Sequence, residues 1–121
     1  MVNVASLAGL VHWPVVPVYS ATKAAVVSFG NACAEVFARH NMRLNTVCPG
    51  FADTRLVRTS QQQFGMGMGR DIRVNVKVDD VVKTIVALLT ISSSHGKTIL
   101  VNEHGAVDWK NVLQKKQKAR L

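Results

Sequence analysis

Residues 20–50 read SATKAAVVSFGNACAEVFARHNMRLNTVCPG, and this stretch decides the fold. Between Ser20 and about His40, small and apolar residues recur at three- and four-residue steps, which predicts a helix packed closely on a flat surface. The stripe consists of Ala21, Ala24, Ala25, Ser28, Phe29, Ala32, Cys33, Val36 and Phe37. From Met42 to Cys48 the pattern is typical of a strand, and Pro49 and Gly50 end it with a turn.

The segments on either side extend this alternation. Residues 1–5 are rich in β-branched side chains and predict a buried strand, and residues 97–101 predict another. Asp79 and Asp80 open a second apolar-periodic helix that ends at the serines of residues 92–94. Residues 52–76 lack a clean period and predict a mobile loop or lid, with room for a short helix. The order of elements favours an α/β fold with a parallel sheet of three strands and two main helices.

Composition excludes several classes of protein. The chain has 121 residues, of which 48% are apolar and 18% are charged, which fits one small folded domain and not a disordered chain. No apolar run reaches the roughly 18 residues of a membrane-spanning helix, and no basic segment precedes an apolar one at the start, so we expect a cytoplasmic protein. The two cysteines, Cys33 and Cys48, lack metal-ligand spacing and are expected to be buried free thiols, and the scattered histidines predict no metal site.

The formal charge of +8 is concentrated at the C-terminus. Residues 109–121 carry five basic side chains and no acid, which leaves +3 for residues 1–108. We therefore divide the chain into a domain over residues 1–108 and a basic tail over residues 109–121. Nucleic acid or an anionic membrane surface could attract such a tail. Because Trp109 is the only aromatic residue in it, nucleic-acid binding is not expected, and a solvated, frayed terminus is the preferred interpretation.

Three polar residues stand out against this scaffold. Tyr19 and Lys23 are four residues apart at a helix start, so both project from one face. An ammonium group near a phenol favours the phenolate, and such a tyrosine can act as a general acid or base toward an alcohol or carbonyl. Ser6 follows the first strand, at the edge where open α/β sheets bind ligands. A tyrosine and a lysine at this spacing are common on helix surfaces, so the pair alone is a weak signal.

The wider context is more specific. Asn3-Val4-Ala5-Ser6, Tyr19-Ser20-Ala21-Thr22-Lys23 and the run from Arg43 to Thr54 resemble the short-chain dehydrogenase/reductase family, including the thirteen-residue step from Ser6 to Tyr19. The resemblance covers nearly the whole chain but only the carboxyl-terminal half of the family's fold. Residues 6–10, 17–19 and 48–51 look most like the 15-hydroxyprostaglandin dehydrogenase branch.

The resemblance implies roles for individual residues in an NAD- or NADP-dependent reaction on a secondary alcohol or ketone. Tyr19 would exchange a proton with the substrate oxygen, Lys23 would favour its phenolate and hold the nicotinamide ribose, and Ser6 would polarise the substrate carbonyl. The nicotinamide end would be lined by Tyr19, Lys23, Pro49, Gly50, Phe51 and Thr54. The substrate mouth would be lined by His12, Trp13 and Val16, and the loop after Thr54 would cover the substrate.

The sequence also departs from the family pattern. The glycine-rich turn, the ribose selector, the Asn-Asn-Ala-Gly strand and the asparagine of the helix that follows it are absent, and Gly65, Gly67 and Gly69 follow no strand and do not replace them. We therefore expect a partial Rossmann-like doubly wound sheet that lacks the amino-terminal dinucleotide-binding half and binds NAD or NADP weakly. The alternative is an inactive relative that acts as a dimerisation module, forming homo- or hetero-oligomers through the helix from Ser20 to His40.

Overall fold

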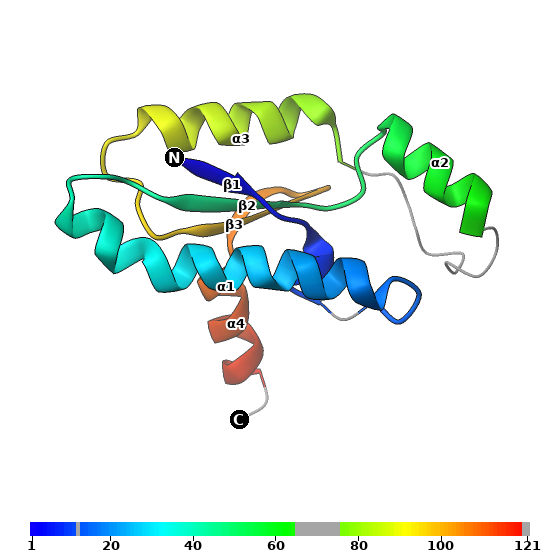
Figure 1. The fold of residues 1–121 in the computed structure, drawn as a ribbon, viewed down its shortest axis with the longest axis horizontal. Coiled ribbons are helices and arrows are strands. Elements are labelled where there is room, and N and C mark those ends of the chain that lie inside the picture. The colour runs from blue at the N-terminus through cyan, green and yellow to red at the C-terminus, as the bar shows by residue number, and fades with distance from the viewer. Residues whose placement is uncertain (12, 65–75, 120–121) are drawn as a thin grey trace.

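The computed structural model describes residues 1–11, 13–64 and 76–119. Figure 1 shows the arrangement of the elements along the chain. The strands are β1 (Val2–Val4), β2 (Asn45–Pro49), β3 (Thr98–Asn102) and β4 (Gly105–Asp108). The helices are α1 (Pro17–Arg39), α2 (Arg55–Phe64), α3 (Val78–Thr90) and α4 (Trp109–Lys118), and a single 3-10 turn, η1 (Leu7–Gly9), follows β1.

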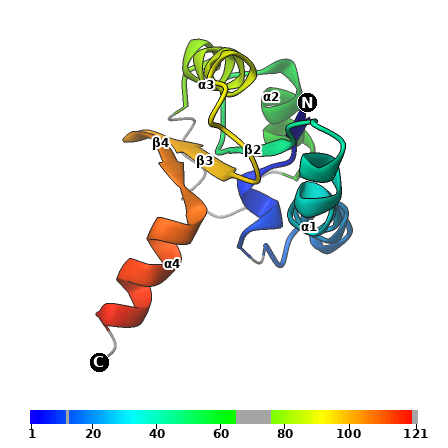
Figure 2. The ribbon, with the colours of Figure 1, turned by 90° about the vertical axis from the view of Figure 1, so that its left-hand side faces the viewer.

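The strands form one four-stranded sheet in the order β1-β2-β3-β4. β1, β2 and β3 run parallel, with Val4 opposite Val47 and Val47 opposite Ile99. α1 and α3 cover opposite faces of this sheet (Figures 1 and 2). The expected α/β fold with a parallel sheet is therefore confirmed, because each parallel pair is joined through a helix that returns the chain to the same edge.

The fourth strand, β4, was not expected and is antiparallel to β3. Glu103 and His104 form a two-residue turn between Asn102 and Gly105, which pair with each other. The Asn102 side-chain oxygen accepts a hydrogen bond from the His104 backbone N–H at 2.8 Å. Gly105 has φ of 105°, a backbone conformation that favours glycine. The four-residue strand is too short for alternation to reveal it in the sequence.

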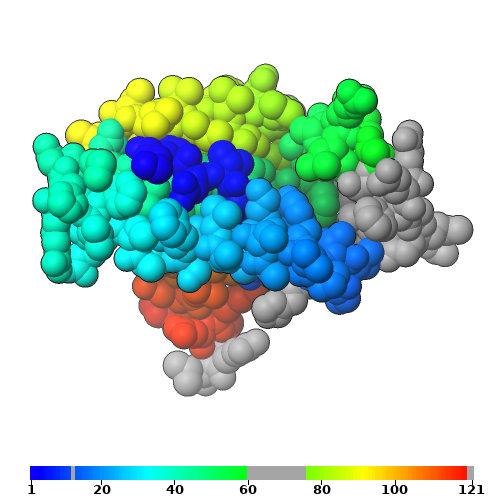
Figure 3. Space-filling view, viewed as in Figure 1, coloured from blue at the N-terminus to red at the C-terminus, as the bar shows by residue number. Residues whose placement is uncertain are grey.

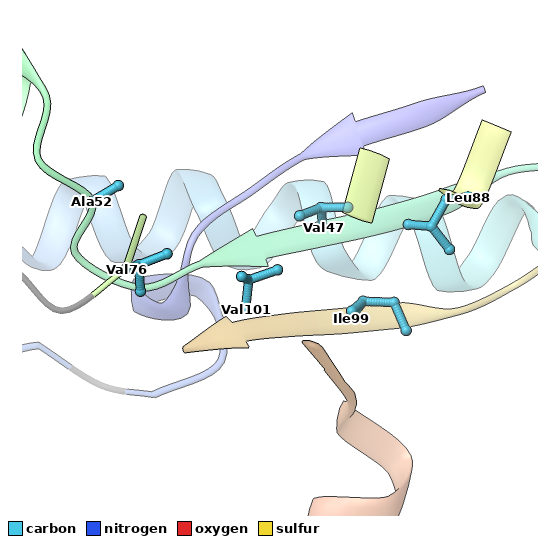
Figure 4. Packing of buried hydrophobic residues seen from close by; sticks show 6 residues of the cluster. All are labelled: Val47, Ala52, Val76, Leu88, Ile99 and Val101. Carbon is cyan, nitrogen blue, oxygen red and sulfur yellow. The ribbon is translucent and has the colours of Figure 1, made fainter. Parts of the chain in front are cut away.

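The main core lies between the sheet and α3 (Figure 4). Val47, Ile99 and Val101 project from β2 and β3 toward Leu88 of α3, and Ala52 and Val76 extend the cluster toward the carboxyl ends of the strands. A second, smaller cluster of Ala5, Val27 and Cys48 lies on the α1 side. Both faces of β2 and β3 are covered, which is why these strands carry apolar residues at successive positions.

α1 packs on the sheet through a different face from the predicted stripe. Val27 and Gly30 are its buried residues, whereas Ala21, Ala25 and Phe29 are exposed. At Gly30, α1 comes so close to β2 that a Cβ atom there would collide with the Thr46 hydroxyl oxygen. The interpretation of the alanine stripe as the packed face is therefore wrong for the structure described here. The helix has apolar residues on two sides, and periodicity alone does not say which side meets the sheet.

Two side chains connect the turn before β2 to distant elements. The Arg43 guanidinium donates to the carbonyl oxygens of Leu88, Leu89, Ile91 and Ser94, at 3.3, 2.8, 2.5 and 3.3 Å. Arg43 thus satisfies carbonyls at the C-terminal end of α3, where a cation is also favoured by the helix dipole. The His95 ring accepts a hydrogen bond from the Leu44 backbone N–H at 3.1 Å, and its other ring nitrogen lies 2.9 Å from the Ala34 carbonyl oxygen of α1.

Three further expectations are corrected by the structure. The first ten residues of the basic tail form α4 and are not frayed, because the Asp108 carboxylate caps the helix by accepting from the Lys110 N–H at 3.1 Å. α1 begins at Pro17, three residues before the expected start, since a proline is well tolerated in a first helical turn. Cys48 is buried, but Cys33 is only partly buried because α1 leaves that flank open.

The part of residues 52–76 that the structure describes is largely helical, as α2. The predicted loop continues through Gly65, Gly67 and Gly69, which lie outside the described residues. Among the helices of the described residues, none is long and apolar enough to cross a membrane.

Candidate active site

A cavity of about 540 Å³ opens at the carboxyl ends of β1 and β2. It lies between the start of α1 and the starts of α2 and α3. The residues that line it are Val4, Ala5, Ser6, Leu7, Ala8, Val16, Tyr19, Lys23, Pro49, Gly50, Phe51, Ala52, Thr54, Leu56, Val57, Val78 and Val81. Most of these are apolar, so the few polar groups among them would determine how a ligand is oriented.

Tyr19 and Lys23 project into this cavity from the first two turns of α1. The Lys23 ammonium nitrogen lies 5.7 Å from the centre of the Tyr19 ring. The same nitrogen donates to the Val4 carbonyl oxygen at 3.3 Å, which ties the lysine to the end of β1. Lys23 carries the only formal charge among the described lining residues, so the Tyr19 hydroxyl shares the cavity with one cation and no anion.

Ser6 enters the cavity from the first turn after β1. Its hydroxyl oxygen accepts a hydrogen bond from the Ala8 N–H at 3.2 Å, which makes Ser6 the cap of η1. This bond uses a lone pair and leaves the hydroxyl hydrogen to be donated to a ligand. Gly9 lets η1 lie directly against α1, because a Cβ atom there would be 2.7 Å from the Lys23 backbone. The close contact places Ser6 and Lys23 on the same side of the cavity.

Cys48 of β2 does not line the cavity but is fully buried behind the lining residue Ala5, in one cluster with Val27. Burial raises the pKa of the Cys48 thiol from an ordinary value of 9.0 to about 11, and the Ser6 backbone N–H and the Lys23 charge offset this only in part. The thiol therefore remains protonated at neutral pH. A buried, protonated thiol is a poor nucleophile, so Cys48 has a packing role in this site.

The segment after β2 forms the second wall of the cavity. The Gly50 N–H donates to the Val101 carbonyl oxygen at 2.8 Å, and a Cβ atom at Gly50 would lie 3.1 Å from Val76. The Thr54 hydroxyl oxygen accepts from the Val57 N–H at 3.4 Å at the start of α2. Pro49, Gly50, Phe51 and Thr54, which the family resemblance assigned to one end of a site, therefore lie together on this wall.

The three residues expected at the substrate mouth have different positions. Val16 lines the cavity. Trp13 is not among the lining residues but packs edge-on against Phe51, with ring centres 5.0 Å apart and an interplanar angle of 65°. Trp13 thus supports a lining residue and does not itself form the wall. His12 lies outside the described residues.

The sequence did not single out the apolar residues that α2 and α3 contribute. Leu56 and Val57 line the cavity from α2, and Val78 and Val81 line it from α3. The only signal for them was the apolar start of each segment, which also fits ordinary core packing. Among the described residues, no group of three or more His, Cys, Asp or Glu side chains is placed to hold a metal ion.

Comparisons with known proteins show what the chain is similar to. A family model described as short chain dehydrogenase matches residues 1–65. The human protein 15-hydroxyprostaglandin dehydrogenase (NAD(+)) is 33% identical over 85 residues, which are 69% of this chain and 31% of that protein. The chain therefore spans about a third of the length of this curated relative.

Two solved structures resemble the fold. Levodione reductase has a TM-score of 0.75 at 23% identity, covering 84% of this chain and 44% of that one. A variant of actinorhodin polyketide ketoreductase with NADPH has a TM-score of 0.74 at 22% identity, covering 84% of this chain and 45% of that one. At these identities the likeness establishes a Rossmann-like fold and nothing further.

Proposed function

The chain belongs to the short chain dehydrogenase family, and we propose on that premise that its cavity is the substrate and nicotinamide end of an NAD- or NADP-dependent oxidoreductase site. The reaction interconverts a secondary alcohol and a ketone. The observation that carries the proposal is the convergence of Ser6, Tyr19 and Lys23 in one apolar cavity at the carboxyl ends of parallel strands.

In this proposal Ser6, Tyr19 and Lys23 have separate roles. Tyr19 gives its phenolic proton to the carbonyl oxygen during ketone reduction and takes the hydroxyl proton during alcohol oxidation. The Lys23 ammonium, 5.7 Å from the Tyr19 ring, stabilises the phenolate that forms in the first case. Ser6 donates its hydroxyl hydrogen to the same substrate oxygen and orients the carbonyl. Most of the lining beside these groups is apolar, which strengthens their electrostatic contacts.

The residues present fit the nicotinamide end of a dinucleotide. Tyr19, Lys23 and Thr54 offer hydroxyl and ammonium groups to the ribose and carboxamide, while Gly50 and Phe51 provide a close backbone and an apolar surface for the ring. A bound nicotinamide would accept the hydride from the carbinol carbon or donate it to the carbonyl carbon. Among the described residues, no glycine-rich turn leads from a strand into a helix N-terminus that could hold a pyrophosphate.

Ligand binding tests this proposal without requiring turnover. Saturation-transfer NMR on the purified chain should show nicotinamide mononucleotide and NAD binding with affinities within about tenfold of each other, because both present the same end to the cavity. Lys23→Ala should abolish both signals, whereas the exposed Lys97→Ala should change neither. If Lys23→Ala keeps both signals, the ligand binds elsewhere and the proposal is contradicted.

A second function, that of an interaction module, is supported by the outer face of α1. Val18, Phe29 and Val36 are 77%, 53% and 54% exposed on this face, and the alanines between them allow close approach of another helix. Figure 3 shows α1 lying across the surface of the molecule. In this alternative the chain pairs with a second copy or with a full-length relative. Sedimentation velocity should then show a dimer that Phe29→Ser dissociates.

A further inference from the structure

The helix α4 carries a dense positive charge that the proposed oxidoreductase chemistry does not use. Lys110, Lys115, Lys116 and Lys118 are all exposed on it, and residues 109–121 contain no acidic side chain. Asp108, the residue before the helix, accepts from the Lys110 N–H as the helix cap and lies at the end of α4 away from Lys115, Lys116 and Lys118. The positive charge of α4 is therefore not neutralised along its own length.

The position of α4 makes this charge accessible. It contacts β3 and β4 but projects away from the sheet, from α1 and from α3 (Figures 1 and 2). Every residue of α4 is at least partly exposed. The helix is therefore accessible to an extended surface, which could not enter the active-site cavity.

Apolar side chains lie among the lysines. A groove of about 280 Å³ runs beside the helix and is lined by Val107, Asn111, Val112, Lys115, Lys116 and Ala119. Leu113, one residue beyond Val112, is 45% exposed. Two ammonium groups thus border an apolar groove. This combination suits a ligand with an anionic head and a hydrocarbon portion, because lysine stems can pack on apolar groups while the ammonium remains at the polar boundary.

We propose that α4 docks on the surface of an anionic lipid bilayer. The bilayer surface presents diffuse negative charge, which point-like lysine ammonium groups match, and hydrocarbon, which the groove and Leu113 can contact. Nucleic acid fits less well. Its phosphates favour the bidentate geometry of arginine, yet the described part of α4 has only lysines, and the exposed Leu113 would gain nothing from a sugar–phosphate backbone.

Vesicle co-sedimentation of the full chain tests the proposal. Vesicles of phosphatidylcholine with about 30% phosphatidylserine should pellet the protein, pure phosphatidylcholine vesicles should not, and about 0.5 M NaCl should release it. A triple variant should weaken partitioning onto the anionic vesicles by about 100-fold. It combines Lys115→Gln, Lys116→Gln and Lys118→Gln. Leu113→Ser should weaken it by a smaller factor.

A matched control separates this helix from net charge. Lys77→Gln, Lys83→Gln and Lys97→Gln combined remove the same charge from exposed lysines outside α4, and should leave partitioning within about threefold of the unmodified chain. Equal loss in the two triple variants would overturn the proposal, since net charge would then suffice. Failure to bind anionic vesicles, with or without binding to duplex DNA in the same buffer, would also overturn it. Circular dichroism confirms that each variant remains folded.

Discussion

Replacing His95 with alanine should lower the free energy of unfolding by about 1.5–4.5 kcal/mol. The imidazole binds two backbone groups that lie 51 and 61 residues before it in the sequence. Its Nδ1 accepts from the Leu44 N–H at 3.1 Å, and its Nε2 lies 2.9 Å from the Ala34 carbonyl oxygen. Because Nδ1 accepts, Nε2 carries the hydrogen and donates to Ala34. The ring therefore fastens the start of β2 to the C-terminal half of α1.

The magnitude follows from what the substitution leaves behind. Leu44 is fully buried, so its N–H loses its partner where water cannot replace it, at a cost of about 1–3 kcal/mol. The bond to Ala34 contributes about 0.5–1.5 kcal/mol more. This total is a large fraction of the stability of roughly 5–15 kcal/mol that is typical of small domains.

Urea unfolding followed by circular dichroism would measure the change as a lower midpoint at an unchanged slope. Native-state hydrogen exchange should also show that the Leu44 amide loses protection. His40→Ala, at an exposed position, is the control and should change stability by less than about 0.5 kcal/mol. His95→Gln keeps one acceptor and one donor and should recover part of the loss. Indistinguishable midpoints for His95→Ala and His40→Ala would refute the reasoning.

Three other substitutions test separate parts of the structure. Arg43→Met removes four bonds to carbonyl oxygens and should cost about 1.5–3 kcal/mol by urea unfolding, whereas the exposed Arg39→Met should cost less than about 0.5 kcal/mol. In an enzyme reconstituted by joining this chain to the amino-terminal half of the human relative, Tyr19→Phe should lower kcat by about 10²–10⁴-fold; near-full activity would exclude Tyr19 as the acid/base. Because burial raises the pKa of Cys48 to about 11, its contribution to stability is constant below pH 9.0 and should be lost between pH 9.0 and about 11. Between pH 9.0 and about 11 the free energy of unfolding should fall by about 3 kcal/mol less in Cys48→Ala than in the unmodified chain. An equal fall in the two proteins would contradict the assignment.

The amino-acid sequence by itself determined the features that depend on neighbours along the chain. Periodicity and punctuation by Pro49 and Gly50 predicted α1, β2, α3 and the parallel sheet, because apolar spacing reflects the repeat of a helix or a strand. The four-residue spacing predicted that Tyr19 and Lys23 share one helix face, and the position of Ser6 after a strand placed it at the ligand-binding edge of the sheet. The resemblance to the short-chain dehydrogenase/reductase family joined the three residues in one site.

Only the tertiary structure decided which surfaces meet. Nothing in the spacing of α1 distinguishes its two apolar faces, and it is the fit of Gly30 against Thr46 that selects the inner one. The apolar walls that Leu56 and Val81 add to the cavity likewise join segments that are distant in sequence. The pairing of β4 with β3, although only a two-residue turn separates them, also depends on how the two segments are placed. The physical reason is the same in each case: close packing and hydrogen bonding depend on the relative placement of whole elements, and local sequence patterns carry no record of that placement.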